Sequence, residues 1–236
     1  MNILGIIPAR GGSKGVPRKN LLKLGGKTLI EIAIDSASES ELLTRTIVST
    51  EDDEIYKIAR EAGADLPFKR PTDLARDDSS SFSVVKHAVE WLHLHEGWET
   101  DIVVILSPTT PFRKEEHIDG VIELLINTKA DAAITVRVPD YPPHWMLLLD
   151  SEKKIYNLIE SGNQYLRRQD TPAVCQPAGS VYALTKKLLY SIGTVLPAGD
   201  TRGYVISEND AVNIDTILQY KLAKALWEEN KSVNSS

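Results

Sequence analysis

Residues 3–20 of the chain read Ile3-Leu4-Gly5-Ile6-Ile7-Pro8-Ala9-Arg10-Gly11-Gly12-Ser13-Lys14-Gly15-Val16-Pro17-Arg18-Lys19-Asn20. The short apolar run at its start is typical of a strand that is covered on both faces of a sheet. Three glycines in the loop that follows let the backbone turn tightly and direct N–H groups at an anion. Four basic residues stand among them. Open α/β sheets bind ligands at the carboxyl ends of their strands, so this loop predicts a polyphosphate site.

The loop matches neither of two common nucleotide-binding patterns. The phosphate loop of many NTPases reads G-x-x-x-x-G-K-[ST], and the dinucleotide-binding turn reads G-x-G-x-x-G. Neither spacing occurs between Arg10 and Asn20, which disfavours both kinds of site. The alternative interpretation is a flexible surface loop that is basic without binding phosphate.

Short apolar runs alternate with longer amphipathic segments, which is the pattern of an α/β fold with a mainly parallel sheet. The predicted strands are residues 3–7, 46–49, 102–106, 132–138, 180–184 and 203–206. The predicted helices are residues 29–38, 52–62, 82–95, 117–126, a short helix from 186, and 216–229. Apolar residues recur in these helices every three or four positions. Thr50 and the serines at 79–81 are suitable N-caps.

The alternation stops after residue 138 and resumes near residue 180. Residues 139–177 hold scattered aromatic residues and the apolar run Trp145-Met146-Leu147-Leu148-Leu149. We interpret them as an insertion of irregular strands within a single domain that spans residues 1–236. A strand made from that run alternates faces, so one face would stay unburied in a monomer. The sequence therefore predicts a homodimer in which a second copy covers the insertion.

The composition is that of a globular protein: 236 residues, 42% hydrophobic and 25% charged, with a formal net charge of −6. An acidic chain without a run of Lys or Arg is not expected to bind nucleic acid, whose phosphates would have to be neutralised. Apolar runs of about six residues fall short of the ~20 that span a bilayer, so we expect no membrane partner. The first residues lack a basic leader and Cys175 is the single cysteine, so we expect a cytoplasmic protein.

The loop resembles that of the cytidylyltransferases that activate sialic acids and related nonulosonic acids, which read I-P-A-R-x-G-S-K-G-x-P-x-K-N. The resemblance continues, in order, through residues 47–50, 70–71, 74–75, Asp77, 80–81, 108–113, 168–169 and 213–216. It therefore covers nearly the whole chain. The resemblance implies a Rossmann-like nucleotide-diphospho-sugar transferase fold, Mg²⁺ as cofactor, and CTP and a sugar acid as substrates. It also implies a dimer in which the inserted segment reaches toward its partner's site.

The resemblance assigns the nucleotide and its triphosphate to Arg10, Gly11, Gly12, Ser13, Lys14, Lys19 and Asn20. Cations must offset the charge of a triphosphate, so the basic members suit this role on chemical grounds as well. Arg70 resembles the family arginine beside the nucleotide, and the alternative is a solvated loop arginine. Ser80 and Ser81 could donate to the base or ribose, or serve only as helix caps. Arg10 and Lys19 are candidate catalytic residues, together with Asp215.

Asp215 lies in the stretch Val212-Asn213-Ile214-Asp215-Thr216, ahead of the last predicted helix. In the family two aspartates with this spacing project from one side of a strand and hold the metal against the phosphates. Asn213 stands at the first of these positions, and its amide oxygen can coordinate Mg²⁺ without adding negative charge. Asp215 and Asn213 are therefore the predicted metal ligands. The alternative for Asp215 is an N-cap of the last helix.

The stretches that the family uses to bind the sugar acid depart further from the family pattern. Residues 106–111 read L-S-P-T-T-P where the family reads L-Q-P-T-S-P, and residues 176–180 read Q-P-A-G-S where it reads R-P-N-G-A. Arg168 is retained, and a guanidinium can bind a substrate carboxylate through two parallel hydrogen bonds. The predicted acid-binding residues are Ser107, Thr109, Arg168, Gln176 and Ala178. The substitutions leave a different acid open, because lost hydrogen-bonding partners change which substituents are satisfied.

The leading prediction is a nucleotidyltransferase that transfers CMP from CTP to a sialic-acid-like nonulosonic acid and releases pyrophosphate. One alternative keeps this chemistry on another acid acceptor, such as a 3-deoxy-octulosonate. A second alternative is a nucleotide-binding protein with weakened catalysis, motivated by Asn213. Retention of Lys19, Asp215 and the whole loop favours an enzyme.

Overall fold

A computed structural model describes residues 1–12, 15–76, 79–192 and 198–233, so Ser13, Lys14 and Asp77 lie outside the described residues. Its centre is a six-stranded sheet in the order β10-β6-β9-β5-β1-β4. The strands are β1 (Ile3–Pro8), β4 (Arg45–Ser49), β5 (Ile102–Leu106), β6 (Ala132–Arg137), β9 (Gln176–Thr185) and β10 (Thr201–Val205). Only β9 runs antiparallel to its neighbours in this sheet. The predicted α/β fold with a mainly parallel sheet is confirmed.

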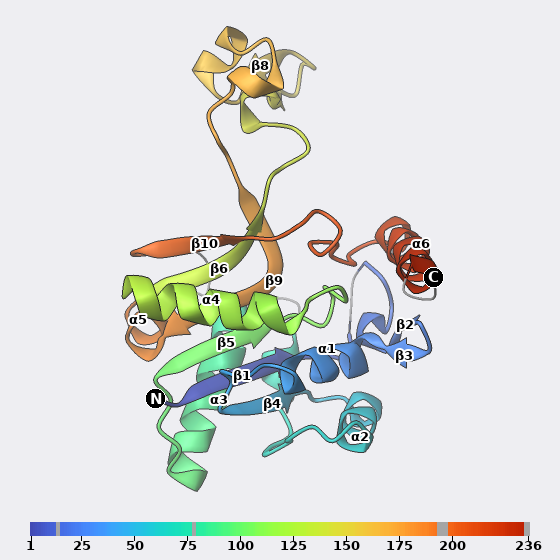
Figure 1. Cartoon of the computed structure of the whole chain (residues 1–236), viewed down its shortest axis with the longest axis vertical. Helices are drawn as coiled ribbons and strands as arrows, with labels where there is room; N and C mark the ends of the chain where they lie inside the picture. Colours follow the sequence, from blue (N-terminus) through green and yellow to red (C-terminus); the bar gives the residue numbers. More distant parts are fainter. Residues whose placement is uncertain (13–14, 77–78, 193–197, 234–236) are drawn as a thin grey trace.

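Helices cover both faces of the sheet (Figure 1). One face packs against α1 (Leu29–Ser38), α2 (Asp53–Glu61) and α4 (Glu115–Thr128), and the other against α3 (Ser81–Glu96) and α5 (Lys186–Ile192). Side chains of β1 alternate between the two cores, with Ile3 and Ile7 in the first and Leu4 and Ile6 in the second. Burial on both faces explains why this strand is a continuous apolar run.

Side-chain caps fix where the first three helices begin. Thr28 accepts from the Glu31 N–H at 3.3 Å, and the Glu31 carboxylate accepts from the Thr28 N–H at 2.6 Å. The prediction of Thr50 as a cap is wrong, because the Asp52 carboxylate accepts from two first-turn N–H groups of α2, each at 3.0 Å. Ser80 caps α3 by accepting from the Ser83 N–H at 3.1 Å.

The largest difference between predicted and observed strands concerns β9, which begins at Gln176 rather than Ser180. Pro177 and Gly179 fall in this first part of the strand, and both residue types normally mark strand ends or irregularities. Gly179 has a φ of 76°, in the region that favours glycine. The register with β6 shifts between Ile134 and Val136, so this part of the pairing is irregular.

The predicted insertion forms an arm between β6 and β9 that stands clear of the sheet (Figure 1). It contains the antiparallel pair β7 (Leu147–Leu149) and β8 (Ile155–Asn157). Three 3-10 turns complete it, at Pro143–Trp145, Glu160–Gln164 and Arg168–Asp170. The three leucines of β7 are 53%, 51% and 68% exposed, so both faces of this strand are open within one chain.

The last helix, α6 (Ile217–Val233), packs beside the hairpin of β2 (Lys23–Leu24) and β3 (Lys27–Thr28). The Tyr220 hydroxyl donates to the Lys23 carbonyl at 2.7 Å, and Trp227 packs in the same apolar cluster. The connection from β10 to α6 is thereby drawn toward the loop after β1. None of the helices in the described part of the chain has the length and apolar character needed to cross a bilayer.

Candidate active site

The five parallel strands end at one edge of the sheet, and three adjoining hollows lie along this edge. The loop hollow, of about 510 Å³, is lined by Arg10, Lys19, Asn20, Ser107, Thr109 and Asp215 among others. The arginine hollow, of about 270 Å³, is lined by Arg10, Arg70, Arg76, Ser79 and Ser81 among others. The β9 hollow, of about 430 Å³, is lined by Arg137, Asp140, Gln176, Ala178, Asn213 and Asp215 among others. Arg10 joins the first two hollows and Asp215 joins the first and third.

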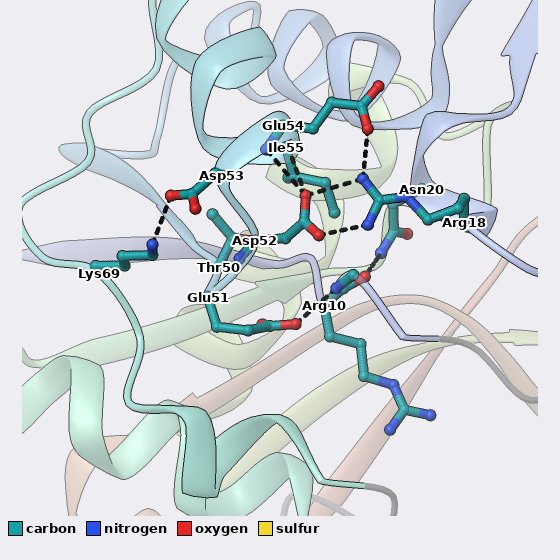
Figure 2. Close-up of polar contacts among 11 residues, drawn as sticks. Arg10, Arg18, Asn20, Thr50, Glu51, Asp52, Asp53, Glu54, Ile55 and Lys69 are labelled. Atoms are coloured by element: carbon teal, nitrogen blue, oxygen red, sulfur yellow. Dashed lines mark hydrogen bonds and ion pairs between the residues drawn. The ribbon is translucent and has the colours of Figure 1, made fainter.

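The loop after β1 is tied to the sheet edge by contacts with the segment after β4. The Gly11 N–H donates to Glu51 Oε1 at 2.7 Å, and a Cβ on Gly11 would lie 2.3 Å from Asp52 Oδ2. The Asn20 amide donates to the Arg10 carbonyl at 2.9 Å (Figure 2). Asn20 therefore also holds the loop through its own side chain, while a side chain at Gly11 would require Asp52 to shift.

Arg18 fixes the far side of the loop through two carboxylates (Figure 2). Its guanidinium pairs with Asp52 and, at 2.6 Å, with Glu54 Oε2. The hydrogen bond from Arg18 lowers the pKa of the Asp52 carboxyl, and the same contact raises the pKa of Arg18. Arg18 is thus occupied in structural ion pairs, which leaves Arg10 and Lys19 as the described loop cations that line the loop hollow.

Arg70 is buried rather than solvated, so the alternative of a free loop arginine is wrong. Its Nε donates to Ser49 Oγ at 3.0 Å, and its NH2 bonds the Ser49 carbonyl. Burial lowers the pKa of Arg70 to about 10, against the opposing pull of Glu51, whose carboxylate lies 3.9 Å away. The side chain remains charged at neutral pH and lines the arginine hollow.

The two serines separate into different roles. Ser80 is the N-cap of α3 and does not line any of the three hollows among the residues described. Ser81, the first residue of α3, lines both the loop hollow and the arginine hollow. Of this pair, Ser81 is the better placed for a nucleotide.

Lys19 and Asp215 meet at the centre of the site. Lys19 Nζ lies 2.8 Å from Asp215 Oδ1, and the Asn213 amide donates to Asp215 Oδ2 at 2.9 Å. A Cβ on Gly15 would lie 2.3 Å from the Asp215 carbonyl oxygen, so the loop approaches this backbone closely. The carboxylate does not cap α6, because the Gln219 N–H donates to Thr216 Oγ1 at 3.3 Å. The approaches of Lys19 and Gly15 to Asp215 require the segment before α6 to reach the loop after β1.

The oxygen atoms near Asp215 suit a metal that is also held by its substrate. No group of three or more His, Cys, Asp or Glu side chains in the described residues could hold a metal alone. Asp215 is 57% exposed beside the loop hollow, whereas Asn213 Oδ1 is buried and has no hydrogen-bond partner. Mg²⁺ commonly binds one or two carboxylates plus phosphate oxygens. Asp215 is therefore the charged oxygen donor beside the loop hollow, and the unpartnered Asn213 Oδ1 is a second candidate ligand.

The predicted acid-binding residues are not all brought together within one chain. Gln176 and Ala178 line the β9 hollow, while Ser107 and Thr109 line the loop hollow and lie 2.9 Å apart through their hydroxyls. Arg168 lies in the arm, where its NH2 donates to the Pro139 carbonyl at 3.0 Å. It does not line any of the three hollows of its own chain, within the described residues.

Sequence reasoning missed two arginines at this edge. Arg137 ends β6 and lines the β9 hollow, and its only sequence signal was a basic residue at the end of a predicted strand. Arg113 is buried, and its NH1 donates to the Ser107 carbonyl at 2.6 Å while its NH2 donates to Ser36 Oγ at 3.1 Å. Burial lowers the pKa of Arg113 to about 9. It positions the loop that carries Ser107, and its place at the end of the 108–113 motif was the available signal.

Comparison with known families and proteins agrees with this geometry. Residues 4–192 match the family described as cytidylyltransferase. Pseudaminic acid cytidylyltransferase of Campylobacter jejuni is 30% identical over 230 residues, which cover 98% of each chain. CMP-N,N'-diacetyllegionaminic acid synthase of Legionella pneumophila is 30% identical over 233 residues, again 98% of each. N-acylneuraminate cytidylyltransferase of Escherichia coli is 30% identical over 223 residues, which cover 94% of this chain and 51% of that longer protein.

Solved structures share the fold at lower identity. The structure of CMP:2-keto-3-deoxy-manno-octonic acid synthetase complexed with CTP has a TM-score of 0.72 at 17% identity and covers 98% of this chain and 100% of that one. The family match covers most of the chain, and two relatives align with it over nearly their full length. The resemblance in the loop and its companion motifs is confirmed, and the chain belongs to the cytidylyltransferase family.

Proposed function

We propose that this protein transfers the CMP group of CTP to a hydroxyl of a nonulosonic acid and releases pyrophosphate. The observation that carries the proposal is the 2.8 Å contact between Lys19 Nζ and Asp215 Oδ1, which joins the loop hollow to the β9 hollow. A triphosphate in the loop hollow would present its α-phosphorus to an acceptor in the β9 hollow. Holding two substrates side by side in this way supplies much of the rate of a group transfer.

The chemistry requires positioning and charge rather than a covalent intermediate. The acceptor hydroxyl attacks the α-phosphorus, the new P–O bond forms as the bond to the β-phosphate oxygen breaks, and the hydroxyl proton passes to solvent. Arg10 and Lys19 offset the negative charge that grows on the phosphates. Arg70 and Ser81 hold the nucleoside side of CTP in the arginine hollow. Positioning and electrostatics dominate phosphoryl-type transfers of this kind.

Mg²⁺ is the proposed cofactor, held by Asp215 and by phosphate oxygens of CTP. When bound, the metal would reduce repulsion between the triphosphate and the attacking oxygen. The Asn213 amide contributes by donating to Asp215 Oδ2 at 2.9 Å, which orients the carboxylate. Unlike an aspartate, Asn213 adds no second negative charge beside the metal. Asp215 is the residue on which metal binding should depend.

The acceptor class rests on the relatives and on the departures at the acid side. The three relatives are named for pseudaminic, N,N'-diacetyllegionaminic and N-acylneuraminic acids. A pyrophosphate-release screen of four nucleotides against these acids and 3-deoxy-manno-octulosonate tests the proposal. Turnover with CTP and a nonulosonic acid is expected. Turnover with the octulosonate alone would select the other acceptor, and CTP binding without turnover would select a catalytically weakened protein.

Ser107 and Ala178 provide a sharper test of which side chains select the acid. The double change Ser107→Gln with Ala178→Asn restores the residues of the sialic acid enzymes at both positions. It should raise the ratio of kcat/KM for N-acetylneuraminate to that for the acid preferred by the native protein. An unchanged ratio in a folded double variant would remove these positions as determinants of specificity.

We propose that the protein is a homodimer in which the arm packs on a second copy and brings Arg168 toward that copy's site. The proposal is supported by the exposure of Leu147, Leu148 and Leu149, because a contiguous apolar patch of this kind normally marks an interface. Light scattering at micromolar concentration should give a dimer, and Leu148→Lys should weaken it. Leu94→Lys, at a 75% exposed position on α3, should leave the dimer intact. A native protein that scatters as a stable monomer would contradict the proposal.

A further inference from the structure

The β9 hollow has an uneven distribution of charge. Asp140, Glu208 and Asp215 line it, and among its described lining residues Arg137 alone is cationic. An acid that enters this hollow brings a carboxylate of its own. Like charges repel and opposite charges attract most strongly where solvent is excluded, so Arg137 is the lining residue that can attract this carboxylate.

Neighbouring strands hold the Arg137 guanidinium in a fixed orientation. Arg137 is the last residue of β6 and stands opposite Gln176, the first residue of β9, in the sheet register. With the amide oriented by its hydrogen bonds, Gln176 Oε1 accepts from Arg137 Nε at 2.8 Å and from NH2 at 2.7 Å. Asp140 lies 3.5 Å from NH1, and the arginine side chain is 21% exposed. The side chain is therefore partly buried, and its guanidinium is held in place before any substrate arrives.

The contacts leave two donors. A guanidinium carries five N–H groups, of which Gln176 takes two and Asp140 takes one, at 3.5 Å. NH1 and NH2 each keep one N–H for a further acceptor, and a guanidinium that donates from both nitrogens can meet the two oxygens of a carboxylate. Gln176 is a neutral partner, so it orients the arginine without cancelling its charge. Asp140 is 53% exposed and distant, so its pairing with Arg137 is weak.

We propose that Arg137 binds the carboxylate of the acid acceptor and that Gln176 is a positioning residue for Arg137. The inference rests on the proposed function, because it needs an acid in the β9 hollow. Arg168 does not line this hollow in its own chain, and in the proposed homodimer it would reach the hollow of the second copy. Arg137 supplies the cation from within the same chain that holds the phosphates.

A purely structural role for Arg137 makes a different prediction. Asp140 lies where the arm leaves β6 and Gln176 lies where the arm returns, so Arg137 also joins the two roots of the arm. If that were its whole role, its loss would lower thermal stability or affect every acceptor equally. A carboxylate contact instead predicts that the loss depends on the charge of the acceptor.

The test compares an acid with its uncharged analogue in native and variant enzymes. The acceptor is whichever of N-acetylneuraminate, N,N'-diacetyllegionaminate or pseudaminate turns over fastest, and the analogue is its C1 carboxamide. The native enzyme should prefer the acid by about 10- to 100-fold in kcat/KM, the range for hydrogen bonds to a charged group. In Arg137→Ala the ratio should fall toward one, with the KM for CTP within about twofold of native. Arg137→Lys keeps the charge and should retain part of the preference, whereas Arg137→Gln should lose it.

Two further arginines serve as comparisons. Arg202→Ala, on β10 where the side chain pairs with Asp200 at 2.9 Å, should keep both the ratio and the activity. Arg168→Ala should keep the ratio if Arg137 is the carboxylate ligand. A ratio that survives in Arg137→Ala and Arg137→Gln, or that collapses only in Arg168→Ala, would overturn the inference while leaving the proposed function intact. Absence of turnover by the native enzyme with all three acids would overturn both.

Discussion

Replacing Gly15 with alanine tests whether the loop after β1 must touch the backbone of Asp215. A Cβ on Gly15 would lie 2.3 Å from the Asp215 carbonyl oxygen, and real Cβ contacts essentially never fall under 3.0 Å. The loop and Asp215 must therefore separate by about 0.7 Å or more, the difference between these two distances. Because the obstacle is backbone, no rotamer change relieves it. Overpacking of this kind costs about 1–3 kcal/mol, which is roughly 2–12 °C in Tm for a domain of this size.

The same displacement would move Lys19 relative to Asp215 and so misalign the two hollows. A misplacement near 1 Å at a reacting centre lowers the rate on the order of 100-fold, which is the expected loss in kcat/KM. The assay is pyrophosphate release at varied CTP and acid, with thermal unfolding in parallel. Gly12→Ala is a control for Tm alone, because its Cβ would meet nothing within 4 Å and should leave Tm unchanged, while Gly12 itself belongs to the phosphate loop. If folded Gly15→Ala turned over as fast as the native enzyme, the close approach would not matter for catalysis.

Three other predictions concern charge at the site and in the core. Lys19→Ala should lower kcat by about 10²- to 10³-fold at saturating CTP, whereas Cys175→Ala should leave it unchanged, and near-native turnover of Lys19→Ala would contradict the loop assignment. Asp215→Asn should abolish turnover, while Asn213→Asp should keep it and lower the Mg²⁺ concentration for half-maximal rate. Burial lowers the pKa of His117 below 6.5, so the unfolded chain binds more protons as pH falls below that value and stability declines on acidification. His117→Gln should flatten this decline in denaturant unfolding measured at about pH 7.5 and 5.5; an unchanged slope would show that another group titrates.

The larger strands and helices of the first half followed from their sequences because they carry complete local signals, whereas the two-residue strands β2 and β3 were not predicted. The strand predicted at residues 102–106 and the helix predicted at residues 29–38 match β5 and α1 in their bounds. In β5 all five residues are buried, so an unbroken apolar run identifies it. In α1 a Thr28–Glu31 capping box precedes the apolar repeat. Where local chemistry and tertiary burial agree, sequence reasoning is sufficient.

The direction and start of β9 could not be read in the same way. The chain leaves β6 at the carboxyl edge of the sheet, builds the arm and returns at that same edge, so β9 must run antiparallel beside β6. Nothing in the period of its side chains distinguishes this from a parallel strand. The Pro177 and Gly179 positions also disguised its first residues, which pair with β6 only through an irregular register.

The candidate site residues also differ in whether the sequence alone could indicate them. Residues of the loop after β1 were identifiable because one continuous stretch supplies the glycines and cations of a phosphate site. Arg137 was not, because its partner Gln176 is remote in sequence and becomes its neighbour only when β6 and β9 pair. The resembled family has arginine where Gln176 stands, so motif comparison alone indicated a lost cation. The strand pairing shows a cation on the adjacent strand instead.

The nucleotide and the acid are proposed to bind in separate hollows, so the acid could differ between enzymes that catalyse the same reaction. The loop and arginine hollows, which we propose for the nucleotide, are built mainly from the segments after β1 and β4 and the start of α3, whereas the β9 hollow, which we propose for the acid, is built from the two roots of the arm and the connection into α6. Lys19 and Gly15 both approach Asp215, which also lines the β9 hollow. Substitutions at Gln176, Ala178 or Arg137 should therefore change which acid the β9 hollow accepts and leave Lys19 and Gly15 in place. That separation fits a loop that keeps the family motif in full while two of the departures, Gln176 and Ala178, line the β9 hollow.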